Sequence, residues 1–118
     1  MSRRVARVAE ALQETVAGLV QREIKDPRVG MVTITRVSVS PDLRNARVYF
    51  SRLGSKDERE RSLEGLRSAS GFIRSQVARR LQLRVAPEIR FELDDNPEYA
   101  ARMADLLGHA DVPETGEN

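Results

Sequence analysis

Apolar residues recur every three or four positions along the first part of the chain, between residues 3 and 25. This spacing places them on one face of a helix, while the charged residues between them fall largely outside that face. The pattern predicts an amphipathic helix that ends at Asp26-Pro27, because a residue before proline is pushed out of helical geometry. The apolar positions are Val5, Val8, Leu12, Val16, Leu19, Val20 and Ile24.

The next two segments are typical of β-strands. Residues 31–40 are rich in β-branched side chains, and residues 46–51 alternate between apolar and polar positions. The Ser-Pro-Asp sequence at 40–42 supplies turn chemistry, so the two strands are expected to form an antiparallel hairpin. The apolar set of the first strand changes phase near Thr35 and Arg36, which predicts a bulge there.

The rest of the chain predicts more helix and one more strand. Residues 56–82 are helical in pattern, with Ser55 as a candidate N-cap. The sequence Ser-Ala-Ser-Gly at 68–71 should break this helix, because glycine in a helix costs about 1 kcal/mol relative to alanine and serine competes for backbone hydrogen bonds. A third strand is expected over 89–93 and a last helix over 96–107.

The predicted order is helix, strand, strand, helix, kink, helix, strand and helix, which defines an α+β fold with a three-stranded sheet. A length of 118 residues fits one domain. We place this domain at residues 1–107, followed by a disordered acidic tail at 108–118.

Charge is distributed unevenly along this order. Residues 1–91 carry a net charge of +9 and residues 92–118 a net charge of −7, and 18 of the 20 cations are arginine. The chain has no cysteine and a single histidine, His109, so thiolate metal sites and histidine-dependent triads are excluded, and no Gly-rich nucleotide-binding motif occurs. We therefore expect no enzyme, no metal, no cofactor and no small-molecule substrate. Without a long apolar run or leader pattern, a cytoplasmic monomer with no membrane contact is expected.

The predicted break in the second helical segment suggests a binding function. A new helix N-terminus after Gly71 would expose backbone N–H groups to an anion. Residues 67–90 hold six arginines and one acid, Glu88, so a phosphate chain could use both the helix end and the cations. A corner with a solvated, arginine-rich face is the alternative, and Arg74 lies close enough to the apolar side to be structural.

Several stretches carry a resemblance to a known family. They are KDPRV (25–29), VTITRVSVSPDLRNARVYFS (32–51), GFIRSQVARRLQLRVAPEIRFELD (71–94) and, more loosely, NPEYAARMADLL (96–107). In this combination the chain resembles ribosome-binding factor A, a bacterial small-subunit assembly factor. The resemblance implies a type II KH fold with an Ala-x-Gly interhelical kink, here Ala69-Ser70-Gly71, in place of the GxxG loop. It also implies a non-enzymatic role: binding the free 30S subunit and 16S rRNA, late maturation with 16S 5′-end processing, and adaptation to cold.

Carried over to this chain, the resemblance and the charge pattern name candidate rRNA-binding residues. The kink and the following segment supply Ser70, Gly71, Arg74, Arg79, Arg80 and Arg84, and the N-terminus supplies Arg3, Arg4 and Arg7. Arg28, Arg44 and Arg47 are secondary candidates, and Tyr49 beside Arg47 is either a base-stacking or a structural residue. Two other functions stay open: a protein-interaction module that uses the acidic C-terminal segment, and a generic KH-type RNA binder.

Overall fold

The computed structural model describes residues 2–94. The expected helix at 96–107 and the expected tail at 108–118 lie outside this range. The described chain contains two helices and three strands, in the order α1 (Arg3–Arg22), β1 (Val32–Val39), β2 (Asn45–Arg52), α2 (Lys56–Arg80) and β3 (Glu88–Leu93). The α+β class and the three-stranded sheet are confirmed.

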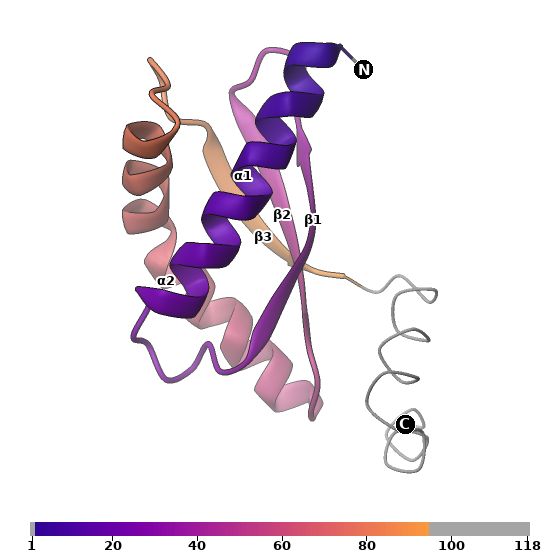
Figure 1. Ribbon diagram of the computed structural model, residues 1–118. Helices are drawn as coiled ribbons and strands as arrows, with labels where there is room; N and C mark the ends of the chain where they lie inside the picture. The colour runs from indigo at the N-terminus through magenta and orange to yellow at the C-terminus, as the bar shows by residue number, and fades with distance from the viewer. Residues whose placement is uncertain (1, 95–118) are drawn as a thin grey trace.

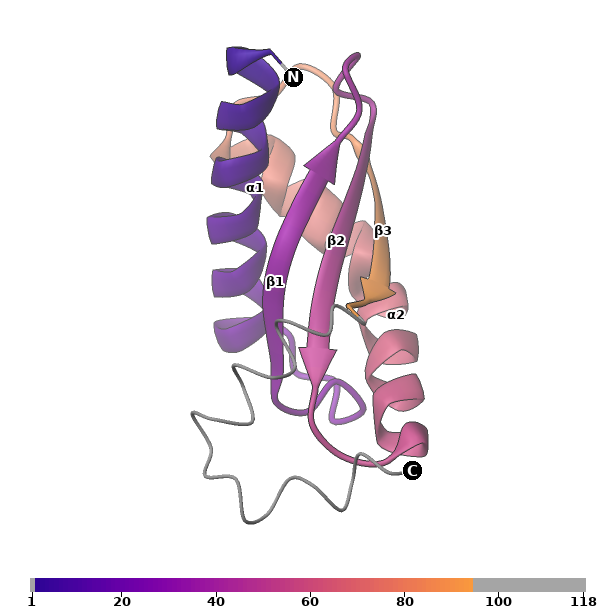
Figure 2. The same cartoon turned by 90° about the vertical axis from the view of Figure 1, so that its right-hand side faces the viewer.

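The sheet has β2 at its centre, antiparallel to β1 and parallel to β3. The β1–β2 pair is the predicted hairpin, and its register shifts between Ile34 and Arg36, which confirms the predicted bulge. Both helices lie on the same face of the sheet (Figure 1), and Figure 2 looks onto the other face. Because β3 follows a helical crossover, it can pair parallel to β2 and form one edge of the sheet.

The core lies between the helices and the inner face of the sheet, and it is mostly aliphatic. Alternate residues of the strands point into it, as the period of two requires. Two phenylalanines, Phe50 and Phe91, are the largest side chains that are almost fully buried. The other almost fully buried apolar side chains are Leu12, Val16, Leu19, Ala46, Val48, Leu66, Ile73, Val77 and Pro87.

Local signals set where the helices begin and end. Ser2 caps α1 by accepting a hydrogen bond from the Val5 amide. Ser55 and Glu58 form a reciprocal capping box at the start of α2, which confirms the predicted N-cap. Helix α1 ends at Arg22, before the expected end at 25, because the amides of Glu23 and Ile24 both donate to the Leu19 carbonyl and close the last turn.

The predicted break in the second helical segment is wrong. Helix α2 runs without interruption from Lys56 to Arg80, and Gly71 is not among the residues with positive φ. The backbone N–H groups around Gly71 therefore stay inside the helix, and the anion site expected at a second helix N-terminus does not form. The tertiary packing of both halves of α2 against the core outweighs the low helix propensity of the serines and the glycine.

Instead of breaking, α2 bends. Figures 1 and 2 both show its axis changing direction near the middle. At this point the Ser70 hydroxyl donates to the carbonyl of Arg67 at 2.8 Å. Serine side chains that bond back to the preceding turn bend helices, and Gly/Ser pairs are common kink sites. The Ala-Ser-Gly sequence therefore marks a bend in one continuous helix.

Candidate nucleic-acid interface

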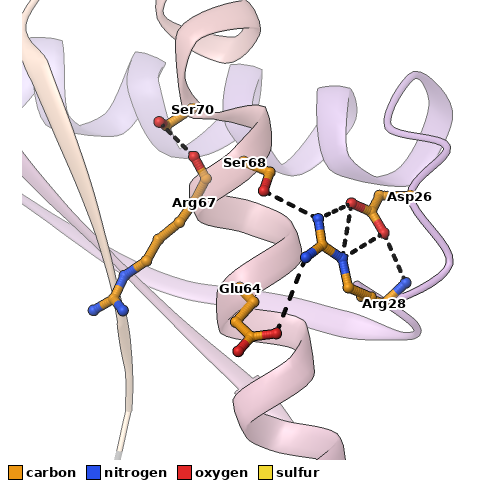
Figure 3. Close-up of polar contacts among 6 residues, drawn as sticks. All are labelled: Asp26, Arg28, Glu64, Arg67, Ser68 and Ser70. Atoms are coloured by element: carbon orange, nitrogen blue, oxygen red, sulfur yellow. Dashed lines mark hydrogen bonds and ion pairs between the residues drawn. The ribbon is translucent and has the colours of Figure 1, made fainter.

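A cleft of about 370 Å³ opens between α2 and the two neighbouring strands β2 and β3. Three arginines from three elements line it: Arg47 of β2, Arg67 of α2 and Arg90 of β3. Arg47 and Arg90 are direct partners in the parallel register. Figure 3 shows Arg67 and Ser70 on the side of α2 that faces β3. We call this feature the arginine cleft.

The arginine cleft has an excess of unpaired positive charge. Within the described residues, the side chains of Arg67 and Arg90 make no hydrogen bond or ion pair. Glu88 is the acid that lines the cleft, and its Oε2 lies 3.3 Å from Nη2 of Arg74. Arg47 forms a 3.8 Å ion pair with Glu92, and the side chain of Tyr49 also interacts with it. A cleft that is lined by three arginines suits the oxygen atoms of a phosphate chain.

Arg74 holds the loop that precedes β3, next to the arginine cleft. Its guanidinium donates two hydrogen bonds, from Nε to the carbonyl of Pro87 and from Nη2 to the carbonyl of Ala86, each 3.1 Å long. Arg74 is only partly exposed. These contacts fix the loop that leads into β3 against α2, so the structural alternative that the sequence left open for this residue is the one observed.

A second group of arginines meets at the end of the molecule where α1 begins. Arg4, Arg44 and Arg84, far apart in sequence, line one cleft of about 200 Å³. Asp42 also lines it, and hydrogen bonds from the Ser40 hydroxyl and the Arg44 amide lower the pKa of its carboxyl group. We call this feature the terminal cleft. Arg3 and Arg7 are exposed on the same turns of α1.

The candidates Arg79, Arg80 and Tyr49 differ in whether their side chains have partners within the domain. Arg80 forms a 2.7 Å ion pair with Glu23, which links the two helices, whereas exposed Arg79 has no side-chain partner among residues 2–94. Tyr49 is covered by Arg36, whose guanidinium carbon lies 3.8 Å from the ring centroid. This intramolecular contact favours the structural interpretation of Tyr49.

Arg28 lies at the centre of a network that fixes the loop after α1 to α2 (Figure 3). Its Nη2 lies 2.6 Å from Oδ2 of Asp26 and 3.0 Å from the hydroxyl of Ser68, and its Nη1 is 4.0 Å from Glu64. The hydrogen bonds from Arg28 lower the pKa of Asp26 from 3.8 to about 2. Arg28 is therefore a positioning residue.

Two arginines of the arginine cleft, Arg67 and Arg90, are absent from the residues that the sequence singled out as contacts. Both belong to the arginine-rich run from 67 to 90, so the composition signal was present. Their convergence with Arg47 depends on the parallel pairing of β3 with β2, which no local pattern encodes. Ser70 does line this cleft, as the sequence suggested, whereas Gly71 is exposed and does not line it.

Two other kinds of site are missing from this part of the chain. Residues 2–94 contain no group of three or more histidine, cysteine, aspartate or glutamate side chains that could hold a metal ion. No helix among these residues is both long and apolar enough to cross a membrane.

The fold and the two clefts define a class: small α+β proteins with two helices on one face of a three-stranded sheet and arginine-lined clefts beside it. A sequence profile of the ribosome-binding factor A family matches residues 4–107 of this chain. Ribosome-binding factor A of Acetivibrio thermocellus is 44% identical over 114 residues, which cover 96% of this chain and 93% of its own. That of Geobacter metallireducens is 44% identical over 118 residues, the full length of both chains.

Solved structures agree with this assignment. The NMR structure of a Thermotoga maritima ribosome binding factor A superposes with a TM-score of 0.72 at 40% identity, over 83% of this chain and 93% of that one. The crystal structure of ribosome-binding factor A from Thermus thermophilus has a TM-score of 0.67 at 26% identity. The superposition covers 75% of this chain and 94% of that one. A homology model of the Thermus protein, fitted into a cryo-EM map of its complex with the 30S subunit, has a TM-score of 0.56 at 26% identity. The superposition covers 79% of this chain and 93% of that one. The chain belongs to the ribosome-binding factor A family.

Proposed function

We propose that this protein is an assembly factor that binds the free 30S subunit by contacting 16S rRNA with its arginine cleft. The observation that carries the proposal is the convergence of Arg47, Arg67 and Arg90 from three elements, with no ion-pair partner for Arg67 or Arg90 among the described residues. Structured cations without counter-charges bind phosphate well, because neutralising phosphates releases condensed counterions. The Thermus relative in a complex with the 30S subunit supports the same partner.

The terminal cleft extends this surface. Arg4, Arg44 and Arg84 converge there from α1 and two loops, with Arg3 and Arg7 beside them. We infer that it contacts a second stretch of rRNA backbone. Arg79 adds another free cation along α2. Two separate basic clefts allow contacts with two stretches of one RNA backbone, and such contacts fix the position and orientation of the RNA.

We also propose the finer parts of this role. The bent helix with its Ala-Ser-Gly sequence would take the place of the GxxG loop of a type II KH domain, which clamps a nucleic-acid backbone. Binding would support late maturation of the small subunit, including processing of the 16S 5′ end, and would matter most in the cold, where misfolded rRNA is slow to rearrange. The protein would act by binding, without catalysis. These proposals rest on membership of the family and on the basic clefts.

The alternative of an acidic interaction module has less support from the described residues. Two of the acids that it counted are engaged inside the domain. Glu92 pairs with Arg47 at 3.8 Å, and Asp94 accepts a hydrogen bond from the Thr35 hydroxyl at 2.5 Å and pairs with Arg36 at 3.4 Å. An acid that is paired within its own domain is not available to a basic partner.

The test is co-sedimentation of the purified protein with small subunits, large subunits and joined ribosomes at two salt concentrations. We expect selective binding to free small subunits that weakens with salt. The double variant Arg67→Glu with Arg90→Glu should bind at least about tenfold more weakly, and its slope of log K against log salt should fall by about two, because each lost phosphate contact lowers the slope by about one.

The matched control reverses the charge of two exposed arginines outside both clefts, Arg22→Glu with Arg61→Glu. Neither forms a side-chain hydrogen bond or salt bridge among residues 2–94, and Arg61 interacts with Glu58 only through its charge. This control makes the same change in net charge. It should lose much less affinity than the cleft variant. Equal losses in the two variants would show that net charge alone drives binding, and unchanged binding of the cleft variant would contradict the proposed site.

A further inference from the structure

A second hollow lies beside the bend of α2, between this helix and the end of α1. It measures about 250 Å³, and its apolar lining consists of Ile24, Ala69 and Phe72. Phe72 is 44% exposed, although its neighbour Ile73 is fully buried. A half-exposed aromatic ring at the edge of a hollow is available to a ligand. We call this feature the Phe72 cleft.

The two acids that line the Phe72 cleft are each paired with an arginine, which leaves Lys25 as the unpaired charge of the lining. Glu23 is paired with Arg80 at 2.7 Å, and Asp26 is paired with Arg28 at 2.6 Å. Lys25 also lines the cleft, and it makes no hydrogen bond or ion pair within the described part of the chain. Arg79 follows Phe72 by seven residues and so lies on the same face of α2, two turns further on.

Gly71 separates the Phe72 cleft from the arginine cleft. A Cβ atom added at Gly71 would meet nothing within 4 Å, so the helix surface there is open. Figure 3 shows Arg67 and Ser70 on one side of α2 and Ser68 on the other, where the Phe72 cleft lies. A nucleic-acid backbone can therefore cross the helix at Gly71 with a basic cleft on one side and an aromatic ring on the other.

We propose that the Phe72 cleft receives an unpaired base of the bound RNA, which stacks on the Phe72 ring while its phosphates lie between Lys25, Arg79 and the open surface of Gly71. The proposal rests on the proposed function and adds a contact to bases to the contacts with phosphates. Single-stranded RNA is commonly bound by such a combination of stacking on an aromatic side chain and a basic groove. The unpaired cations Lys25 and Arg79 favour a nucleotide over the apolar side chain of a protein partner, which would carry no compensating charge.

The chain contains no tryptophan, so Phe72→Trp introduces a single fluorescent reporter at the proposed site. The full chain is titrated with single-stranded RNA of mixed sequence and, separately, with an abasic ribose-phosphate oligomer of the same length. Stacking should quench the fluorescence with RNA but not with the abasic oligomer. Leu53→Trp is the matched control, because Leu53 is 54% exposed and lies outside this cleft. Equal quenching of both reporters, or quenching by the abasic oligomer, would overturn the proposal.

The second measurement is affinity for the same RNA. Phe72→Leu should weaken binding by about tenfold, the usual loss when one stacking side chain is removed, and Phe72→Tyr should restore it. The slope of log K against log salt should stay unchanged, because no phosphate contact is lost. Phe72 is half exposed, so Phe72→Leu should fold normally, and its melting temperature checks this.

The possible results separate this proposal from the proposed function. If the Arg67→Glu, Arg90→Glu variant binds RNA like the wild type, the arginine cleft is not the RNA-binding site. The proposed base site, which rests on that assignment, is then wrong too. If that variant loses binding but Phe72→Leu binds as well as the wild type, only the base site is wrong. Loss of small-subunit binding without loss of RNA binding in Phe72→Leu would assign the cleft to a ribosomal protein and would also overturn the proposal.

Discussion

Two glycines of α2, Gly65 and Gly71, should respond in opposite directions to substitution by alanine. Both occupy interior positions of one continuous helix. At Gly71, an added Cβ meets no atom within 4 Å. The substitution Gly71→Ala should therefore contribute only its helix propensity, which raises the free energy of unfolding by about 1 kcal/mol.

Gly65 lies where the loop after α1 passes closest to the helix. An added Cβ would lie 2.8 Å from Cγ2 of Val29 and 3.1 Å from the Val29 backbone nitrogen. The loop is held in place, because the Val29 carbonyl accepts hydrogen bonds from the Ser62 hydroxyl at 2.6 Å and from Arg52 at 3.2 Å. Overpacking of this kind costs about 1–3 kcal/mol, so after the gain in propensity Gly65→Ala should lose about 1 kcal/mol.

The two variants should therefore differ by about 2 kcal/mol in stability, or roughly 8–16 °C in melting temperature for a domain of this size. Thermal unfolding followed by circular dichroism measures the difference directly, with the wild type between the two variants. A Gly71→Ala variant that melts below the wild type would show that the helix is broken at this glycine after all. A Gly65→Ala variant that melts above it would refute the claim that the loop cannot move.

Two further predictions concern ionised side chains. Because Arg28 lowers the pKa of Asp26 from 3.8 to about 2, the stability gained from this pair is complete above pH 4 and disappears as the pH falls towards 2. Asp26→Asn should thus melt below the wild type at pH 7, and the gap should close at acid pH; a gap that is independent of pH would contradict this. Arg74→Met should lose about 1–2 kcal/mol, because two carbonyl groups lose their donor. Arg79→Met, which removes an arginine without partners, should melt like the wild type, and similar losses in both variants would contradict the assigned roles.

The arginines of this domain fall into two groups that their sequence positions do not distinguish. Arg28, Arg74 and Arg80 are bound to carbonyl or carboxylate groups of the domain itself. Arg67 and Arg90 have no such partner within residues 2–94. The first group holds loops and helices together, so the second group can form a surface of fixed shape. Because the backbone beneath these cations is already fixed, binding phosphate costs conformational entropy only in their side chains.

Much of the fold was predictable because its signals are local. The apolar stripe of α1, the alternation in β2, the change of phase at the bulge and the capping serine each act within a few residues. The break at Ser-Ala-Ser-Gly was predicted from the same kind of signal, and there tertiary packing prevailed. Burial of Leu66 before the bend and of Ile73 and Val77 after it keeps the helix in one piece.

By itself, the sequence determined the order of the elements from α1 to β3 apart from the predicted break, the basic character of residues 1–91 and the resemblance to one family. The tertiary structure decided which arginines are available. Arg47 and Arg90 are neighbours only because β3 pairs parallel to β2, and Arg67 joins them only because α2 crosses beside that edge. The physical reason is the distance along the chain over which each feature is decided. Helix and strand patterns arise from residues close together in the sequence, whereas a cleft is formed by distant residues that meet only when the whole core packs.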